Sequence, residues 1–127
     1  MKPTTRNAGY SMLELLVVLA IMALIVTVGV PVLTGGVERM TLSADARSLA
    51  TQLRTWRDAA LDEQKEIPVT VNDLALSAGT EATMPAKTLV IGQDGTAGAD
   101  IRLTRGGSSV RVVMNRLTGR VTIETLP

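Results

Sequence analysis

Residues 6–22 read RNAGYSMLELLVVLAIM and place one carboxylate, Glu14, near the start of an otherwise apolar stretch. From Leu15 to Val30 there is no charged residue. With residues 10–14 before it and 31–33 after it, this stretch is long enough to cross a bilayer core of about 30 Å. The sequence therefore predicts a transmembrane helix over residues 10–33. Its single acid is expected to have a partner, because a carboxylate in lipid is costly.

The flanking charges predict the orientation of this helix. Lys2 and Arg6 precede it closely, and positive residues tend to stay on the cytoplasmic side. The alternative is a cleaved secretory signal, which also has a basic segment before an apolar one. The length of the run, the lack of a small-x-small site in a polar context and the presence of Glu14 argue against that alternative. We expect a cytoplasmic N-terminus and a C-terminal domain across the membrane.

The stretch AGYSMLELLVVLAI, residues 8–21, resembles the class III signal of type IV pilins and type II secretion pseudopilins. In that family a short basic leader ends in Gly, and Glu is the fifth mature residue. The resemblance implies that residues 1–9 are a cytoplasmic leader, cut between Gly9 and Tyr10 by an inner-membrane prepilin peptidase. It also implies N-methylation of Tyr10 and an assembly role for Glu14. Tyr10 departs from the usual Phe but keeps an aromatic ring.

Pro31 is the twenty-second residue counted from Tyr10, a position where many members of that family carry a proline. A proline inside a helix removes a backbone donor and clashes with the preceding turn. We therefore predict a helix kink at Pro31. The alternative is a helix that simply ends at the membrane surface.

Composition narrows the function. The chain has no cysteine and no histidine, so thiol chemistry and the Ser/His and Cys/His nucleophile arrangements are excluded. We expect no enzymatic activity, no cofactor and no metal. The formal net charge of +1 argues against a surface devoted as a whole to nucleic acid.

Residues 34–66 are predicted to form the amphipathic periplasmic half of the same helix, ended by Pro68. Its apolar positions recur at spacings of three and four, namely Leu42, Ala46, Leu49, Leu53, Trp56 and Ala60. Asp58, Asp62 and Glu66 would line up on the other side. They could form a metal or acid–base site, but we favour a solvated polar face.

Residues 67–127 are predicted to be a β-rich periplasmic domain. Val69 with Val71 indicates one strand, Thr88–Ile91 another, and Ala78–Lys87 a loop. A two-residue hairpin at Gly106–Gly107 and a four-residue loop at Arg116–Gly119 predict a three-stranded antiparallel meander. The predicted cross-strand pairs are Leu103 with Val110, Ile101 with Val112, Met114 with Val121, and Val112 with Ile123. The fold class is therefore α+β, with the sheet packed on the second half of the helix.

The other face of this sheet would carry Arg102, Arg111 and Glu124 in a row, with Asn115 beside Arg120. Such a basic face could bind DNA phosphates. However, no lysine and no exposed aromatic residue accompany the arginines, and Glu124 lies opposite Arg111. We favour a solvated outer face and do not expect DNA as a partner.

The segments GQDGTAGADIRLTRGG (92–107) and VRVVMNRLTGRV (110–121) are similar to the C-terminal pattern of the GspH/FimT group. Its secretion branch implies a minor pseudopilin near the tip of a periplasmic filament. Its FimT branch implies a minor pilin, which in some bacteria binds DNA through a GRxR element. Gly119 and Arg120 match the start of that element, but Thr122 stands where its second Arg would be.

Taken together, these resemblances imply a minor pseudopilin of a type II secretion system, held in the bacterial inner membrane by a single span. The implied partners are other pseudopilins or pilins, the prepilin peptidase, the inner-membrane assembly platform and membrane lipid. The alternatives are a FimT-like minor pilin for pilus biogenesis or DNA uptake, and a lone signal-anchored protein with a small periplasmic domain.

Overall fold

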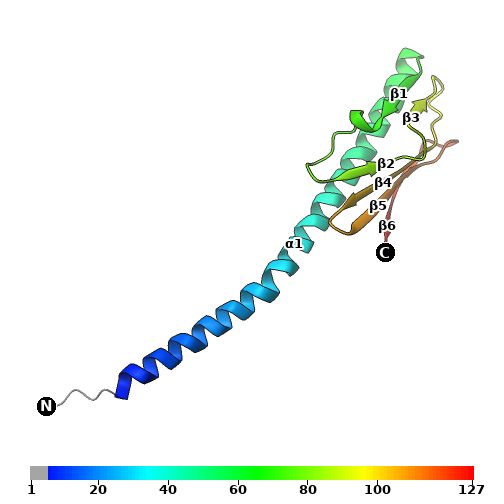
Figure 1. Cartoon of the computed structure of the whole chain (residues 1–127). Helices are drawn as coiled ribbons and strands as arrows, with labels where there is room; N and C mark the ends of the chain where they lie inside the picture. The colour runs from blue at the N-terminus through cyan, green and yellow to red at the C-terminus, as the bar shows by residue number, and fades with distance from the viewer. Residues whose placement is uncertain (1–5) are drawn as a thin grey trace. The chain divides into compact units, whose positions relative to one another are not determined.

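The computed structural model describes residues 6–127, and the chain divides into two compact units at Gly36 and Val37. Figure 1 shows one long helix and two small groups of strands. The elements are α1 (Arg6–Glu63), β1 (Ile67–Thr70), the 3-10 turn η1 (Val71–Asp73), β2 (Glu81–Thr83), β3 (Thr88–Ile91), β4 (Ala99–Arg105), β5 (Ser108–Met114) and β6 (Val121–Leu126).

In the first unit, α1 carries apolar side chains that are exposed all round the helix from Tyr10 to Leu33. Pro31 lies inside the helix, which continues through it without a break. Because proline has no N–H, the carbonyl of Thr27 lacks its usual helical donor there. The hydroxyl of Thr27 donates to the carbonyl oxygen of Ala23 at 2.7 Å. The kink remains a prediction.

The predicted C-terminal boundary of the long helix was wrong by a few residues. The helix ends at Glu63, three residues before the predicted end at residue 66. Gln64 adopts a left-handed conformation with φ of 48°, and the N–H of Lys65 donates to the carbonyl of Ala60 at 3.2 Å. This is a Schellman-type C-cap, which closes the helix before Pro68 is reached. Glu66 therefore lies outside the helix and does not continue the row of Asp58 and Asp62.

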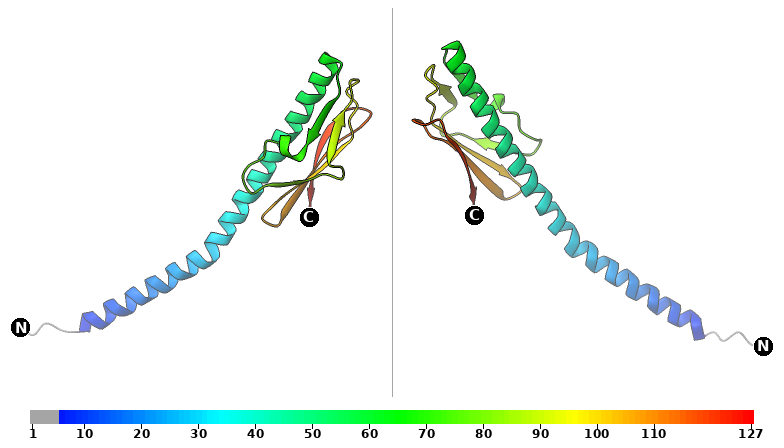
Figure 2. Two further views of the ribbon diagram at one scale, coloured as in Figure 1. Left: turned by 45° about the horizontal axis from the view of Figure 1, so that its top comes forward. Right: turned by 180° about the vertical axis from the view of Figure 1, so that it is seen from behind.

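In the second unit, the predicted apolar stripe of α1 packs against the strands, and the two views of Figure 2 show the helix lying across the sheet. Trp56 is half-buried against this core, and Ala50 and Asp45 are buried on the same side of the helix. The fully buried members of the predicted stripe are Leu42, Ala46, Leu49, Leu53 and Ala60. The α+β prediction is confirmed.

The main sheet has four antiparallel strands in the order β2-β4-β5-β6. The predicted meander is confirmed in its register: Leu103 faces Val110, and Met114 faces Val121. The other two predicted pairs, Ile101 with Val112 and Val112 with Ile123, are also present.

Two turn residues explain why this register forms. Gly106 and Gly107 have φ of 50° and 79°, which is the backbone of a two-residue type I′ turn. This turn matches the right-handed twist of the flanking strands and sets Arg105 opposite Ser108. Every pair up to Ala99 with Met114 then follows.

The prediction of a loop over Ala78–Lys87 was wrong, because β2 lies inside it and makes the fourth strand of the main sheet. Its three residues, Glu81–Thr83, pair with Arg102–Thr104. A strand of three residues is too short to show an alternating pattern, so only its pairing defines it.

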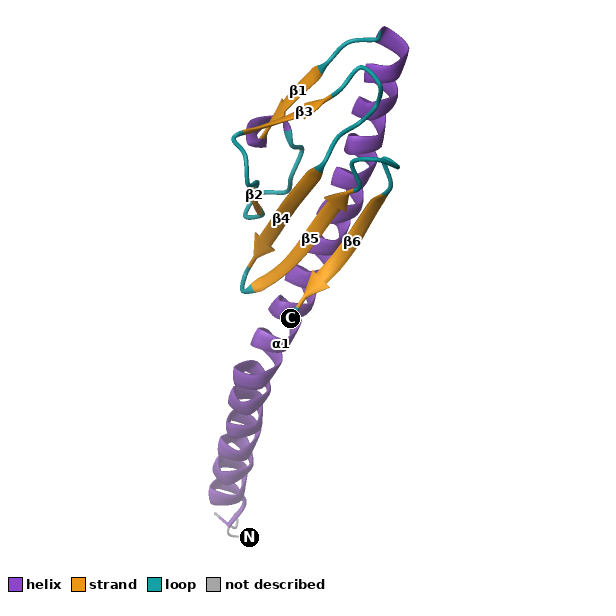
Figure 3. Cartoon of the chain, turned by 90° about the vertical axis from the view of Figure 1, so that its right-hand side faces the viewer, coloured by secondary structure: helices purple, strands orange, loops and turns teal. Residues whose placement is uncertain are grey.

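A second sheet consists of β1 and β3, which are antiparallel and lie apart from the main sheet in Figure 3. The first predicted strand ends earlier than Val71, which belongs to η1. The cause is local: the Asp73 carboxylate accepts hydrogen bonds from the N–H and the hydroxyl of Thr70, both at 2.7 Å. These bonds turn the chain out of the strand.

Candidate functional site

The residues of the predicted processing and assembly site lie at the start of α1. The peptide bond between Gly9 and Tyr10 lies within the helix, whereas residues 1–5 of the predicted leader, with Lys2, are outside the described residues. Tyr10 is 76% exposed and Glu14 is also exposed. Because they are four residues apart, Tyr10 and Glu14 lie on the same face of the helix. A free amine at Tyr10 would thus stand one turn from the Glu14 carboxylate.

The helix around this site can hold the chain in a membrane. Among the described residues, the helix that runs from Tyr10 is long and apolar enough to span a bilayer, and its most apolar part lies near the N-terminus. All of that part is exposed in the chain by itself. Lipid, or other helices of the same kind, can cover these side chains.

The predicted arginine face is the outer face of the main sheet. Arg102 of β4 lies opposite Arg111 of β5, and Arg111 lies opposite Glu124 of β6, so the predicted row is present. Asn115 donates from its backbone N–H to the carbonyl of Arg120 at 2.8 Å. Arg120 itself precedes β6 by one residue and is exposed.

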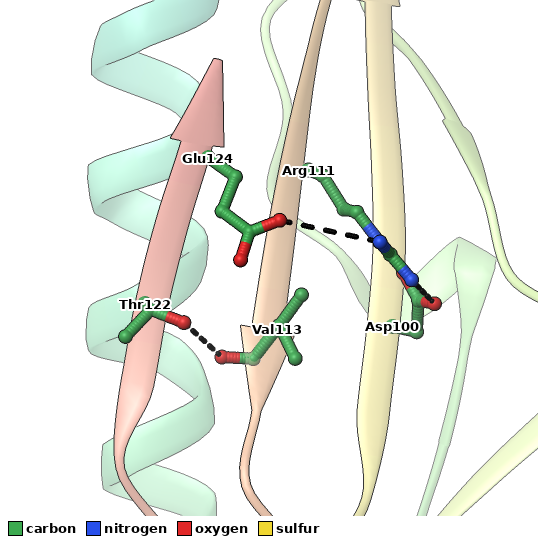
Figure 4. A network of polar contacts seen from close by, with 5 residues as sticks. All are labelled: Asp100, Arg111, Val113, Thr122 and Glu124. Atoms are coloured by element: carbon green, nitrogen blue, oxygen red, sulfur yellow. Dashed lines mark hydrogen bonds and ion pairs between the residues drawn. The ribbon is translucent and has the colours of Figure 1, made fainter. Parts of the chain in front are cut away.

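A residue that the sequence reasoning left out changes the character of this face. The Arg111 guanidinium binds the carboxylate of Asp100 through two nitrogens, with Nε donating to Oδ1 at 2.7 Å. Glu124 lies on the other side, with Oε2 at 4.0 Å from Nη1 of Arg111 (Figure 4). Asp100 sits on the same face as Arg102, two positions along β4. Its place at the start of the strand was the signal that could have revealed it.

These contacts set the charge state of the pair. The hydrogen bond from Arg111 is the main cause that lowers the pKa of Asp100, and its charge adds to the effect against a smaller penalty from burial. The same hydrogen bond raises the pKa of Arg111. With Glu81 of β2 also in register opposite Thr104, the outer face carries three carboxylates against Arg102, Arg111 and, just before β6, Arg120.

A second polar cluster, also missed from the sequence, joins α1 to the segment before β2. Asp45 as a whole residue is only 5% exposed. Its Oδ1 accepts from the hydroxyl of Ser77 at 2.7 Å and from the N–H of Ser77 at 3.3 Å, and its Oδ2 accepts from the hydroxyl of Thr80 at 2.6 Å. Arg105 donates through Nη1 to the same Thr80 hydroxyl at 3.2 Å.

The environment of Asp45 keeps it ionised. Burial by itself would raise its pKa, but the hydrogen bonds from Thr80 and Ser77 and the positive charge of Arg105 together lower it. Charge-assisted hydrogen bonds of this kind are about twice as strong as neutral ones. The signal in the sequence was an acid placed directly beside Ala46 of the apolar stripe. The cluster links α1 to the segment between η1 and β2, and the described residues hold no group of three or more potential metal ligands.

The features described so far define a class of protein. A long N-terminal helix, apolar in its first part and packed through its second part against an antiparallel sheet, is a pilin-like α+β fold. Comparison with protein families found that residues 4–30 match the prokaryotic N-terminal methylation motif. The motif supports a type IV pilin-like protein, a structural class whose members are processed by prepilin peptidase and assemble with other pilins.

The comparison with curated proteins found no match, and neither did the comparison with solved structures.

Proposed function

We propose that the chain is a minor pseudopilin of the GspH type, a structural subunit of the periplasmic filament of a type II secretion system. The observation that carries this proposal is the methylation motif over residues 4–30, in which Glu14 follows Tyr10 by one helical turn. Cleavage after Gly9 and N-methylation of Tyr10 would leave a positive amine one turn from that carboxylate. Inner-membrane insertion with a periplasmic C-terminal domain follows from the basic residues before the span.

The assembly step rests on the cost of an unpaired charge in lipid. A carboxylate inside the membrane is destabilised unless a cation neutralises it. The Tyr10 amine, in the same chain or on the neighbouring subunit, is the cation that the motif supplies. The apolar side chains from Tyr10 to Leu33 would then pack against the helices of other subunits.

The outer face of the main sheet favours the secretion branch over DNA uptake. Asp100, Glu124 and Glu81 balance Arg102, Arg111 and the exposed Arg120 just before β6, so the face offers no surplus of positive charge to phosphates. Thr122, which replaces the second arginine of the GRxR element, lies in β6 opposite Val113. We therefore place the FimT-like minor pilin second.

The experiment is complementation of a deletion strain with wild-type protein and with Glu14→Leu. We expect the wild type to restore export of type II substrates, and Glu14→Leu to insert and be cut but to fail to co-purify with the other pseudopilins. Thr27→Leu, a change in the same helix that adds no charge, is the matched control. Normal export in the deletion strain, together with lost DNA uptake, would instead identify the protein as a FimT-like minor pilin.

A further inference from the structure

A groove of about 570 Å³ separates the two sheets of the second unit. One wall is β3, the other is the first half of β4, and residues 84–86 close one side. Its lining is mostly apolar, and Arg116 contributes a charged side chain. This size lies within the range of ligand-binding clefts.

The β4 wall has an unpaired backbone edge. Because the type I′ turn makes Arg105 and Ser108 a hydrogen-bonded pair, alternation along β4 directs the N–H and C=O of Thr104, Arg102 and Asp100 away from β5. Strand β2 pairs with the first two of these residues and ends at Thr83. If β2 continued, Pro85 would stand opposite Asp100, and proline has no N–H to donate. The backbone groups of Asp100 therefore face the groove.

The β3 wall is open in the same way. Pro68 of β1 lies opposite Val90, and a proline is accommodated where the ladder needs no N–H from it. This places the N–H and C=O of Val90, and by alternation those of Thr88, on the side away from β1. Strand β3 pairs with β1 and with no other strand of the described chain. The side chain of Val90 is 48% exposed.

We propose that this groove binds an extended segment of a partner polypeptide, which adds as a strand between β3 and β4. Unpaired backbone donors and acceptors on both walls suit a peptide backbone, which carries the same groups at the same spacing. Three of the lining residues are small, namely Ala97, Gly98 and Ala99. They leave room for larger side chains of the bound segment.

The charged side chains of the groove further restrict which peptide segment it can bind. Among the groove residues Asp100 is already neutralised by Arg111. Arg116 is exposed and makes no ion pair within the described residues, and its charge acts only at longer range on the Asp94 carboxylate. The groove thus favours a segment with alternating apolar residues and a carboxylate near Arg116. The identity of the segment as part of another filament subunit rests on the proposed function. The binding of an extended segment in the groove does not depend on that function.

The test uses the full chain in detergent micelles and a synthetic peptide, blocked at both ends, of alternating threonine and valine with a central glutamate. Amide hydrogen exchange followed by NMR should show fast exchange at Val90 and Asp100 in the free protein. The peptide should slow exchange at these two amides by at least about tenfold at saturation, because each gains a hydrogen bond. Protected amides in the free protein, or no slowing at saturating peptide, would overturn the proposal.

Two further measurements separate strand addition from nonspecific adhesion. The same peptide with N-methylated valines should lose binding without any change in the protein. The protein variant Val90→Pro should lose it too, whereas Val71→Pro, at an exposed valine outside the groove, should bind as the wild type. Equal binding of the N-methylated peptide would contradict the proposal.

The charge preference has its own control. A lysine-centred peptide should bind wild-type protein several-fold more weakly than the glutamate-centred one, and Arg116→Glu should invert this order. Arg54→Glu, the same change on the exposed face of α1, should leave the order unchanged. Because peptide binding requires no filament, a failure of secretion complementation would not affect this result, and a failure here would not affect assembly.

Discussion

The carboxylate of Asp100 holds the guanidinium of Arg111 diagonally across two strands, with Nε and Nη2 both donating. Directly across the ladder Arg111 faces another arginine, Arg102, and the diagonal bond offsets the repulsion between them. Within the arginine row that the sequence suggests as a phosphate-binding face, the central arginine is therefore already paired with an acid.

The first prediction concerns DNA. Wild-type protein should bind duplex DNA weakly even at low salt. Replacement of two acids of the outer face, Asp100→Asn with Glu124→Gln, should increase the affinity and steepen its salt dependence, since each neutralised phosphate adds about 0.9 to the log–log slope. A gel-shift titration at two salt concentrations measures both quantities.

Asp58→Asn with Asp62→Asn makes the same charge change on the exposed face of α1 and should have the smaller effect. Micromolar, salt-sensitive binding by the wild type that is lost in Arg111→Ala, Arg120→Ala would reverse the choice between secretion and DNA uptake.

The second prediction concerns Asp45. Asp45→Ala should lower the free energy of unfolding by about 1 to 2 kcal/mol, because the hydrogen bonds from Ser77 and Thr80 to the buried Asp45 would be lost, although water can reach the exposed Ser77. Trp56, the single tryptophan and part of the same core, reports unfolding by its fluorescence in a denaturant titration. Asp58→Ala on the exposed face should change the free energy by less than about 0.5 kcal/mol. Equal losses in the two variants would mean that the buried hydrogen bonds contribute nothing.

The third prediction is a pH dependence from the same residue. The pKa of Asp45 is lowered in the folded chain, so its ionised form contributes stability that is present above the unfolded value of about 3.9. That contribution is lost as the pH falls through the folded pKa. The difference in unfolding free energy between wild type and Asp45→Asn should therefore be full near about pH 6 and shrink toward about pH 3. A difference that stays constant over this interval would exclude the ionised carboxylate as its source.

The fourth prediction concerns Gly119, which is buried and has φ of 66°. A side chain there would overlap the guanidinium of Arg57, whose Nε donates to the carbonyl of Gly95 at 3.3 Å. Gly119→Ala should cost about 1 to 2 kcal/mol for the left-handed backbone and more for the displaced arginine. Gly107 has φ of 79° and open space around it. Gly107→Ala should therefore show only the loss of stability that comes from the left-handed backbone. Thermal unfolding of both variants compares the two costs, and an equal loss would show that Arg57 moves aside freely.

The fifth prediction concerns processing. The mature protein should begin at N-methylated Tyr10, and Gly9→Val should abolish the cut because a side chain would block the peptidase site. N-terminal mass spectrometry of membrane-extracted protein measures both. An intact leader in cells with active prepilin peptidase would contradict the prediction.

Much of the fold follows from short-range patterns. The apolar stripe from Leu42 to Ala60 recurs at helical spacing and is buried as predicted, except for the half-buried Trp56. The Gly106–Gly107 turn fixes the register of β4 and β5, and the short loop after Met114 fixes that of β5 and β6. In each case the information lies within a few residues along the chain. The methylation motif is equally local, since its spacing between Gly9, Tyr10 and Glu14 can be read directly.

The sequence by itself determined the long apolar N-terminal helix, the methylation motif and the hairpin registers, because periodicity and turn chemistry act between neighbours. Tertiary structure alone decided the partners of the charged groups and the open strand edges. Asp45 meets Ser77 across 32 positions and Arg111 meets Asp100 across a hairpin. The three residues of β2 form a strand only because β4 offers them a partner. The groove between β3 and β4 lies next to the point where the pairing of β2 with β4 ends at Thr83, which can be seen only in the folded chain.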